Sequence, residues 1–324
     1  MNSGGSEGFI WIGTNEGVLN RFSRKDESFI HYNYNLPNSI ALTTDDYFSY
    51  PLSFSRNSAN TITAITEDDE NNLWIGTWGK GLVYFNKTSG AIKHYYNIPS
   101  DSGSLSSNRV TDIVKDKSGI VWISTLNGGL NKLIGSPESN DVKFISYKTI
   151  NSSNGISSNQ LIALFNDKYN SLWIGSFRSG VSILNSDQKQ LPLKHAKFIT
   201  YSNSVSNPQS ISNNSVMSII EDDYGEIWLG TFGGGLNYFD RKSNSFFSYK
   251  NDPFNENSIA DNDVLSLNID KSGVIWIGTH LGKGLSKLER NSVKFGLMQR
   301  EIGNSNSLSD DVVWAIYEDE NEIL

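Results

Sequence analysis

The stretch LWIGTWGKGLVYF, residues 73–85, decides the fold because it recurs along the whole chain. Each copy has Trp, then Ile or Leu, a small residue, Thr or Ser, and a turn that in most copies is rich in glycine. The other copies are IWIGTNEGVLNRF (10–22), VWISTLNGGLNKL (121–133), LWIGSFRSGVSIL (172–184), IWLGTFGGGLNYF (227–239) and IWIGTHLGKGLSKL (275–288). A motif that returns at a steady period indicates a repeat architecture.

A second motif precedes five of these copies. It begins with Asn, alternates apolar and polar residues, and ends in an acidic or glycine-containing turn, as in NTITAITEDDENN (60–72). A sixth example, DDVVWAIYEDENE (310–322), has no Trp motif after it. The starts of the six examples are Asn60, Asn108, Asn159, Asn214, Asn262 and Asp310, at spacings of 48 to 55 residues.

Each repeat is predicted to form four short strands, here called a to d in chain order. Alternating β-branched and aromatic residues between Gly, Asn, Asp and Ser turns are typical of antiparallel hairpins. Four-stranded units of this length are β-propeller blades. We predict an all-β, six-bladed propeller whose ring is closed by N- and C-terminal strands; the alternative is part of a seven-bladed ring. The blades are centred on core tryptophans at Trp11, Trp74, Trp122, Trp173, Trp228 and Trp276.

The two ends of the chain read as parts of one blade. Residues 1–7 are expected to be a linker or tag, and the chain as a whole, 1–324, a single propeller domain. A closed propeller leaves no unpaired inner edge. We therefore expect the C-terminal strand, 312–319, to pair beside 8–14, so that Trp11 and Trp314 share a blade.

Composition excludes several classes of function. The net charge is −8 without a Lys or Arg cluster, so nucleic acid is not an expected partner. Cysteine is absent, which excludes disulfides, thiolate metal sites and cysteine nucleophiles. No apolar run is long enough to span a bilayer. Neither a metal site nor a cofactor is expected, and the acidic turns are interpreted as hairpin turns.

The repeated WIGT motif, with its preceding EDxxGN-like turn, resembles the two-component regulator propeller family. The resemblance implies the extracytoplasmic, periplasmic sensor part of a bacterial hybrid two-component receptor that detects glycan fragments. It also implies downstream receptor domains, and a second receptor chain is a further possible partner. Members often have seven blades per ring, whereas six can be assembled here.

Residues that break the repeat on one face are the candidates for function. In a propeller the d–a and b–c loops emerge on the face where small ligands commonly bind. The residue after each strand-a Asn or Asp varies but is always polar: Thr61, Arg109, Gln160, Ser215, Asp263 and Asp311. Such side chains can bind hydroxyl groups, and the alternative interpretation is a solvated channel mouth.

The b–c turn supplies the second candidate set. The residue after the Thr or Ser is Asn15, Trp78, Leu126, Phe177, Phe232 or His280. Aromatic members can stack on a sugar face, or can simply wedge between blades. At the next position Asn127 and Arg178 replace glycines, and Lys80 lies between two glycines. The candidate ligand-binding residues are Arg109, Gln160, Asp263, Asp311, Trp78, Lys80, Asn127, Phe177, Arg178, Phe232 and His280.

Two further features leave alternatives open. The d–a segment 36–60 is longer than its counterparts and carries Tyr47, Phe48, Tyr50 and Phe54, which predicts a lid, an interdomain contact, or local packing. Asp263 and Asp311, in equivalent positions, could form a carboxylate pair for glycosidic chemistry, with Arg109 nearby. The preferred hypothesis is nevertheless a non-catalytic propeller that senses a carbohydrate-like ligand; the alternatives are a protein-interaction scaffold and a carbohydrate-active lyase or hydrolase.

Overall fold

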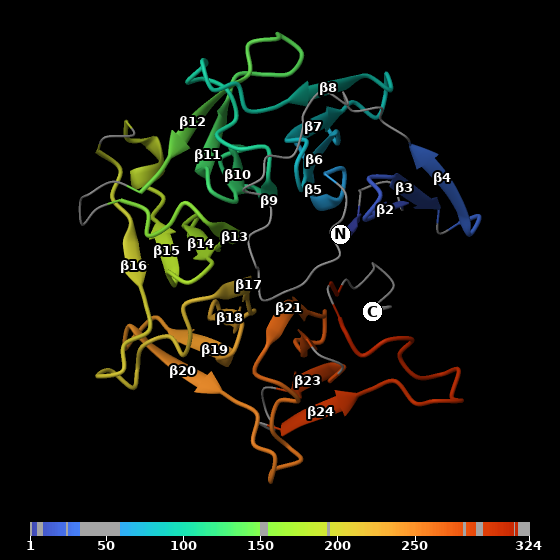
Figure 1. Ribbon diagram of the computed structural model, residues 1–324, viewed down its shortest axis with the longest axis vertical. Helices are drawn as coiled ribbons and strands as arrows, with labels where there is room; N and C mark the ends of the chain where they lie inside the picture. The colour runs from blue at the N-terminus through green and yellow to red at the C-terminus, as the bar shows by residue number, and fades with distance from the viewer. Residues whose placement is uncertain are drawn as a thin grey trace. The chain divides into compact units, whose positions relative to one another are not determined.

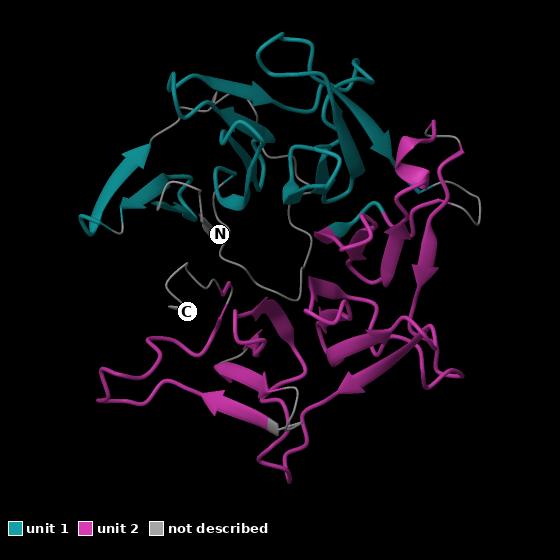
Figure 2. Ribbon diagram, turned by 180° about the vertical axis from the view of Figure 1, so that it is seen from behind, with its two compact units in different colours: residues 1–150, 159–161 teal, residues 151–158, 162–324 magenta. Residues whose placement is uncertain are grey.

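The computed structural model describes residues 2–4, 9–23, 25–32, 59–149, 155–192, 195–280, 283–289, 294–313 and 315–316. The chain folds as two compact units (Figure 2). Unit 1 comprises residues 1–150 and 159–161, and unit 2 comprises 151–158 and 162–324. Each unit is built from the same four-stranded antiparallel sheets.

Unit 1 contains three of these sheets, each numbered from strand a to strand d (Figure 1). The first consists of β1 (Asn2–Gly4), β2 (Phe9–Gly13), β3 (Leu19–Ser23) and β4 (Ser28–Tyr32). The second consists of β5 (Ile62–Glu67), β6 (Leu73–Thr77), β7 (Leu82–Phe85) and β8 (Ile92–Tyr95). The third consists of β9 (Val110–Lys115), β10 (Val121–Thr125), β11 (Gly129–Ile134) and β12 (Lys143–Tyr147).

The remaining three sheets belong to unit 2, apart from the first residue of β13. The fourth consists of β13 (Leu161–Asn166), β14 (Leu172–Ser176), β15 (Val181–Leu184) and β16 (Ile199–Tyr201). The fifth consists of β17 (Val216–Glu221), β18 (Ile227–Thr231), β19 (Gly235–Asp240) and β20 (Ser245–Tyr249). The sixth consists of β21 (Val264–Ile269), β22 (Ile275–Thr279), β23 (Leu285–Glu289) and β24 (Lys294–Met298).

These six sheets are the blades of a β-propeller, and the predicted all-β fold class is confirmed. The described residues contain no α-helix; the 3₁₀ turn η2 spans Gln188–Gln190. The recurrent Thr or Ser at the end of strand b has a structural role, since its hydroxyl donates to a carbonyl across the b–c turn. This bond measures 2.7–2.9 Å for Thr77, Thr125, Ser176, Thr231 and Thr279.

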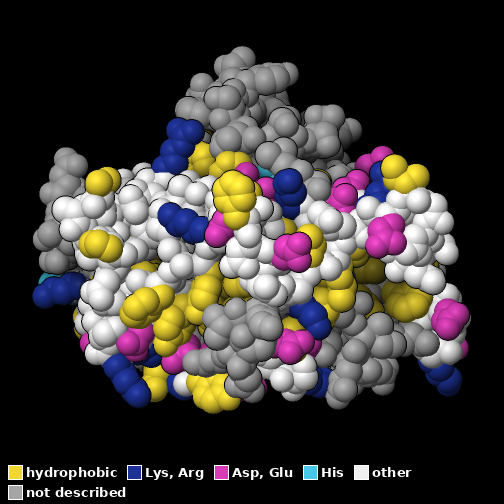
Figure 3. Space-filling model, turned by 90° about the horizontal axis from the view of Figure 1, so that it is seen from below, with side chains coloured by type: hydrophobic (Ala, Val, Ile, Leu, Met, Phe, Trp, Pro, Cys, Tyr) yellow, Lys and Arg dark blue, Asp and Glu magenta, His cyan; other side chains and the backbone are white. Residues whose placement is uncertain are grey.

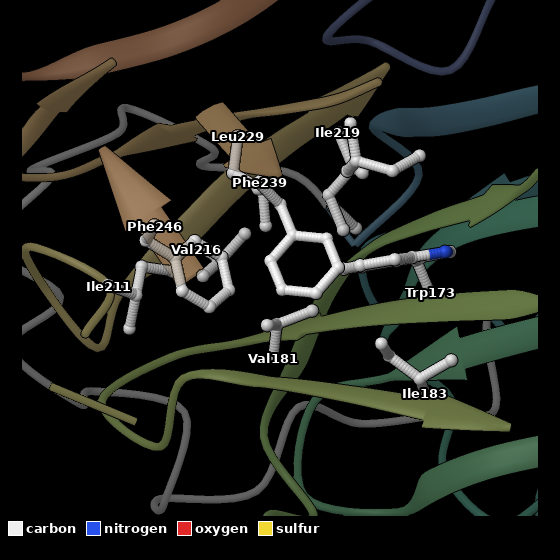
Figure 4. Close-up of a cluster of buried hydrophobic side chains, with 11 residues drawn as sticks. Trp173, Val181, Ile183, Ile211, Val216, Ile219, Leu229, Phe239 and Phe246 are labelled. Atoms are coloured by element: carbon white, nitrogen blue, oxygen red, sulfur yellow. The ribbon is translucent and has the colours of Figure 1, made fainter. Parts of the chain in front are cut away.

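Four strand-b tryptophans pack against the following blade, as their size predicts: Trp11, Trp74, Trp173 and Trp228. Trp173 is 1% exposed and lies in a cluster with Val216, Ile219 and Phe239 of the fifth sheet (Figure 4). Burying an aromatic side chain of this size removes roughly 150–250 Å² from water, which neither blade could do alone. Trp11, Trp74, Trp122 and Trp228 are also buried, and Trp276 is partly buried.

The acidic a–b turns are hairpin turns, as interpreted from the sequence. In the fourth sheet one Asp167 oxygen accepts the backbone N–H groups of Tyr169 and Ser171, at 3.0 and 2.7 Å. Its other oxygen accepts the Trp173 indole N–H at 2.9 Å. Asp116, Asp222 and Asp270 make the same bonds in their blades. The carboxylates therefore fold the hairpins and hold the core tryptophans.

The first blade differs from the prediction for the chain ends. Strand β1 pairs antiparallel with β2, with Ser3 opposite Trp11, so Asn2–Gly4 occupies the edge predicted for 312–319 and is not merely a linker. A hairpin partner only a few residues away closes the shortest loop, which costs the least chain entropy. In the predicted C-terminal strand, Val312, Val313, Ala315 and Ile316 form no strand; Trp314 and 317–319 lie outside the described residues.

Charged side chains of both signs are interspersed on the face shown in Figure 3, without a continuous basic patch among the described residues. Within the same part of the chain, no helix is long and apolar enough to cross a membrane.

Candidate functional site

The two candidate sets predicted from the sequence are joined through the backbone within each blade. The residue after the strand-b Thr donates its N–H to the carbonyl of the residue after the strand-a Asn. This bond measures 2.9 Å from Leu126 to Arg109 and 3.0 Å from His280 to Asp263. It recurs at 2.9 Å from Trp78 to Thr61 and from Phe232 to Ser215. Strand a and the b–c turn therefore present their variable side chains together.

The two sets also meet across blade boundaries. The Arg109 guanidinium carbon lies 6.0 Å from the centre of the Trp78 ring, which belongs to the preceding blade. One boundary further on, the Gln160 side-chain amide donates to Asn127 Oδ1 at 3.2 Å. A residue at the start of strand a thus contacts the b–c turn of the blade before it. At two successive blade boundaries of unit 1, residues that break the repeat therefore lie together.

At the first of these two boundaries the residues are cationic and aromatic. Arg109 is 8% exposed and Lys80 is 6% exposed, while Trp78 is half-buried. The distance between Arg109 and Trp78 lies at the outer limit of a cation–π interaction. Beneath the turn, His94 Nε2 contacts the Lys80 carbonyl oxygen, which anchors the b–c turn to strand d.

In unit 2, at the boundary between the fifth and sixth blades, the corresponding residues are acidic and aromatic. The His280 and Phe232 ring centres are 5.8 Å apart, and Asp263 Oδ2 lies 3.8 Å from His280 Nδ1. Phe232 also forms a β-bridge with Asp263. Burial raises the pKa of the Asp263 carboxyl above its usual value, and the nearby charge of Asp261 raises it further; His280 acts in the opposite direction.

The b–c turn of the fourth blade presents an arginine. Phe177 is buried, at 7% exposed, so little of its ring is open to a ligand. Arg178 is exposed and its guanidinium carbon lies 4.7 Å from the centre of the Phe177 ring. Its backbone is left-handed, with φ of 69°.

The structure corrects the position of Asp311. Its Oδ1 accepts the Arg300 N–H at 2.5 Å, and its carbonyl accepts the Gly284 N–H at 2.8 Å. Asn262 makes the same two bonds, with Asn251 and Gly235, at 2.9 and 2.8 Å. Asp311 is thus the counterpart of the strand-a Asn and organises the d–a loop.

This shift of one residue has consequences for the predicted site. Val312, not Asp311, is the counterpart of Asp263, so the predicted polar set ends in an apolar residue and the proposed carboxylate pair at equivalent positions is wrong. Asp310 supplies the side-chain cap two residues before Val312, because its Oδ1 accepts the Val312 N–H at 2.8 Å. Asp261 caps Asp263 in the same way, also at 2.8 Å.

Two residues near the site were not predicted from the sequence. Asp261 was missed as a charge beside Asp263, although its place two residues earlier was readable. His94 was missed because it lies on strand d, outside the two registers that vary. The predicted aromatic segment, including Tyr47 and Phe54, lies outside the described residues.

The fold and these turns define a class of protein: a β-propeller built from short, similar four-stranded repeats. The sequence model described as Two component regulator propeller matches residues 58–79, 104–127, 210–233 and 258–280. Each match runs through strands a and b into the b–c turn. The chain therefore carries two-component regulator propeller repeats, as the motif predicted.

Solved structures share the fold. The extracellular domain of the putative hybrid two component system BT3049 from B. thetaiotaomicron has a TM-score of 0.72 and 23% identity, over 99% of this chain and 37% of that one. PorZ, a surface component of the type-IX secretion system of Porphyromonas gingivalis, has a TM-score of 0.67 and 18% identity, over 97% and 43%. Virginiamycin B lyase from Staphylococcus aureus has a TM-score of 0.61 and 13% identity, over 93% and 84%.

The chain thus spans little more than a third of the BT3049 ectodomain that it resembles. No curated protein matches the chain in sequence.

Proposed function

We propose that this chain is a non-catalytic, ligand-sensing propeller of a bacterial two-component receptor, located outside the cytoplasm. Its ligand is carbohydrate-like and binds over the b–c turns and the starts of the strand-a segments. The observation that carries the proposal is the contact between Arg109 and the Trp78 ring across a blade boundary. The repeat does not require either side chain, since Gln160 and Leu126 occupy the same positions one blade later.

The chemistry of these residues suits a sugar. A half-buried indole offers an apolar face to the C–H groups of a pyranose ring, and the neighbouring guanidinium can donate to its hydroxyl groups. Unit 2 by itself offers a second candidate surface, in which Phe232 and His280 supply rings and Asp263 supplies an acceptor. An apolar surface edged by fixed polar groups is the usual composition of a small-molecule site.

The similarity to a hybrid two component system ectodomain supports the sensing role and the extracytoplasmic location. The partners would be the downstream domains of the receptor, with a second receptor chain as an additional candidate. Ligand binding would alter how the propeller packs against these domains. An equilibrium between two packing arrangements shifts only by the difference in ligand affinity between them.

A thermal-shift screen of the 324-residue chain against neutral and acidic oligosaccharides tests this function. The expected result is that at least one glycan raises Tm and that Trp78→Ala abolishes the increase. Tyr224→Ala is the matched control because Tyr224 is an exposed aromatic residue, 69% exposed, in an a–b turn. If no glycan stabilises the chain but the chain binds a purified protein partner, the interaction-scaffold hypothesis replaces this one.

A carbohydrate-active lyase or hydrolase is the second candidate, favoured by the 3.8 Å approach of Asp263 to His280. A carboxylate beside an imidazole can act as a general acid–base pair. Release of product from a polysaccharide, lost in both Asp263→Asn and His280→Gln, would establish this activity and refute the non-catalytic assignment.

A further inference from the structure

Arg178 stands at a left-handed position of the b–c turn where the fifth blade has a glycine. We propose that Arg178, supported by Phe177 and neighbouring Ser215, forms a subsite for an anionic group, a carboxylate or sulfate, carried by the ligand. The proposal rests on the proposed function for the rest of that ligand. Within unit 2, it adds an anion-binding group to the aromatic and acidic residues Phe232, His280 and Asp263.

The backbone of this turn favours glycine, yet the sequence has arginine. The counterpart of Arg178 in the fifth blade is Gly233, with φ of 87°, and in the third blade it is Asn127, with φ of 71°. Glycine adopts this conformation without steric cost, and asparagine adopts it more readily than other residues. An arginine at φ of 69° therefore costs backbone free energy that the fold does not require.

The guanidinium is presented to solvent in a defined orientation. It lies over the Phe177 ring at 4.7 Å, while Phe177 itself is buried. Stacking on a fixed ring restricts the rotamers of a long side chain, so less conformational entropy is lost when a ligand binds. Within the described residues, Arg178 forms no ion pair.

By analogy with the preceding blade boundary, the repeat predicts a hydroxyl group beside this guanidinium. Asn127 and Gln160 are hydrogen-bonded to one another, at 3.2 Å, across the preceding boundary. Their counterparts at this boundary are Arg178 and Ser215. The Gly180 N–H donates to the Asn214 carbonyl at 2.8 Å, which fixes the turn against the residue before Ser215.

This combination is specific for an oxyanion. Guanidinium presents parallel N–H donors that match the two oxygens of a carboxylate or sulfate, and a hydroxyl adds a third donor. Uncharged sugar hydroxyls would not need a full positive charge at a strained position. The inferred ligand is accordingly an acidic sugar, either uronic or sulfated.

Sulfate titration of the full 324-residue chain tests the anion site directly. The Arg178 Nε–H resonance, assigned by its absence in Arg178→Gln, is expected to shift in a saturable manner as sodium sulfate is added at constant ionic strength. The same titration of Ser215→Ala should need a higher sulfate concentration. Absence of a saturable shift in the wild-type protein overturns the proposal.

A pair of sugar probes then tests the charge requirement. Tetragalacturonate and its fully methyl-esterified form differ mainly in the carboxylate charges. Calorimetric titration should give at least about tenfold tighter binding of the acid form, equivalent to about 1.4 kcal/mol. Arg178→Gln should remove most of this preference, whereas Lys242→Gln, which neutralises an exposed cation beside a c–d turn, should retain it.

The outcomes separate this proposal from the broader function. Equal binding of both sugars by the wild-type protein supports carbohydrate sensing and overturns the anion subsite. A preference for the acid form that persists in Arg178→Gln also overturns it. Saturable sulfate binding at Arg178 with neither sugar bound supports the subsite but counts against a sugar of this type as the ligand.

Discussion

The guanidinium carbon of Arg109, at the start of strand a, lies 6.0 Å from the ring centre of Trp78, in the b–c turn of the preceding blade. The two residues are 31 positions apart in the sequence, and neither is explained by the repeat. Their contact shows that the variable positions of successive blades form shared surfaces. A ligand bound there would contact two blades at once.

Removing this contact should weaken ligand binding without unfolding the blade. Trp78→Ala is expected to reduce the affinity for a glycan identified in the thermal-shift screen at least about tenfold, because the stacking surface is lost. Arg109→Lys should weaken binding less than Arg109→Ala. Lysine keeps the positive charge and loses only the planar guanidinium group with its paired N–H donors. Calorimetric titration measures both; unchanged affinity in Trp78→Ala would contradict this location for the site.

Neutralising Asp263 should stabilise the protein at neutral pH. Its pKa is raised in the folded state, so the ionised form is less favourable there than in the unfolded chain. The contribution of the carboxyl to stability is therefore present below about pH 4 and is lost as pH rises through the folded pKa. Asp263→Asn should raise Tm by about 1–2 °C at pH 7.

The pH dependence provides the control for that substitution. The difference in Tm between Asp263→Asn and the wild-type protein should shrink towards about pH 3.5, where protonation of the carboxyl removes the unfavourable charge. A gain that is equal at both pH values would mean that the charge of Asp263 is not its cause. In Asp261→Asn, NMR titration should show a lower pKa for Asp263.

His94 should make the protein less stable in mildly acidic solution. Burial lowers the pKa of His94, and its Nδ1 has no hydrogen-bond partner among the described residues. The unfolded chain therefore binds the proton more readily, and stability falls as pH decreases below about 6.5. His94 is only partly buried, so solvent screening should limit the effect to about 1 kcal/mol.

Urea denaturation at pH 7.5 and 5.5 measures this dependence. His94→Gln, which can still donate to the Lys80 carbonyl, should reduce the difference in unfolding free energy between the two pH values. His195→Gln, which changes an exposed histidine, should leave the difference unchanged. The assignment fails if the His94 variant retains the full wild-type dependence.

Asp167 should contribute more to stability than its counterpart in the sixth blade. Its side chain is fully buried and forms an ion pair with Arg241 at 2.8 Å, in addition to the bonds that close the turn and hold Trp173. Asp167→Ala would leave Arg241 with Glu221, at 3.3 Å, as an ion-pair partner, so the loss should stay below the roughly 3–5 kcal/mol typical of breaking a fully buried pair. Urea denaturation measures the change.

Asp270→Ala is the matched control for this prediction. Asp270 makes the same turn bonds and accepts the Trp276 indole N–H at 2.7 Å, without a cation partner in the described chain. Its removal should cost less than that of Asp167. Equal losses in the two variants would show that the Arg241 ion pair adds no net stability.

Much of the fold was predictable because its signals are local. The Asp at each a–b turn, the Trp six residues later and the Thr or Ser at the end of strand b lie within one hairpin, and the structure bonds them to one another or to the adjoining turn. Gly175 illustrates why the motif has glycine before the Thr or Ser: a Cβ there would lie 2.9 Å from Val216 Cγ1 and 3.0 Å from the Val216 carbonyl oxygen.

The residue-by-residue alignment of the repeats and the pairing of the first blade were less predictable. Asp310 and Asp311 are adjacent, identical residues, and either could begin the last repeat when only the sequence is read. The structure distinguishes them by bonds to the backbone of Arg300 and Gly284, which a sequence pattern does not contain. The partner of β2 was also mispredicted. The unpaired edge of a strand can pair with any segment nearby, so the sequence pattern alone did not distinguish residues 2–4 from 312–319.

The sequence by itself determined the class of fold, the core tryptophan of each blade and most of the residues that break the repeat, because hairpins form through contacts within about a dozen residues. Only the tertiary structure decided which of those residues meet. Arg109 with Trp78, Gln160 with Asn127, and Asp263 with Phe232 are contacts between blades, set by how one twisted sheet packs on the next. Such packing depends on side chains of two repeats together, which no single motif encodes.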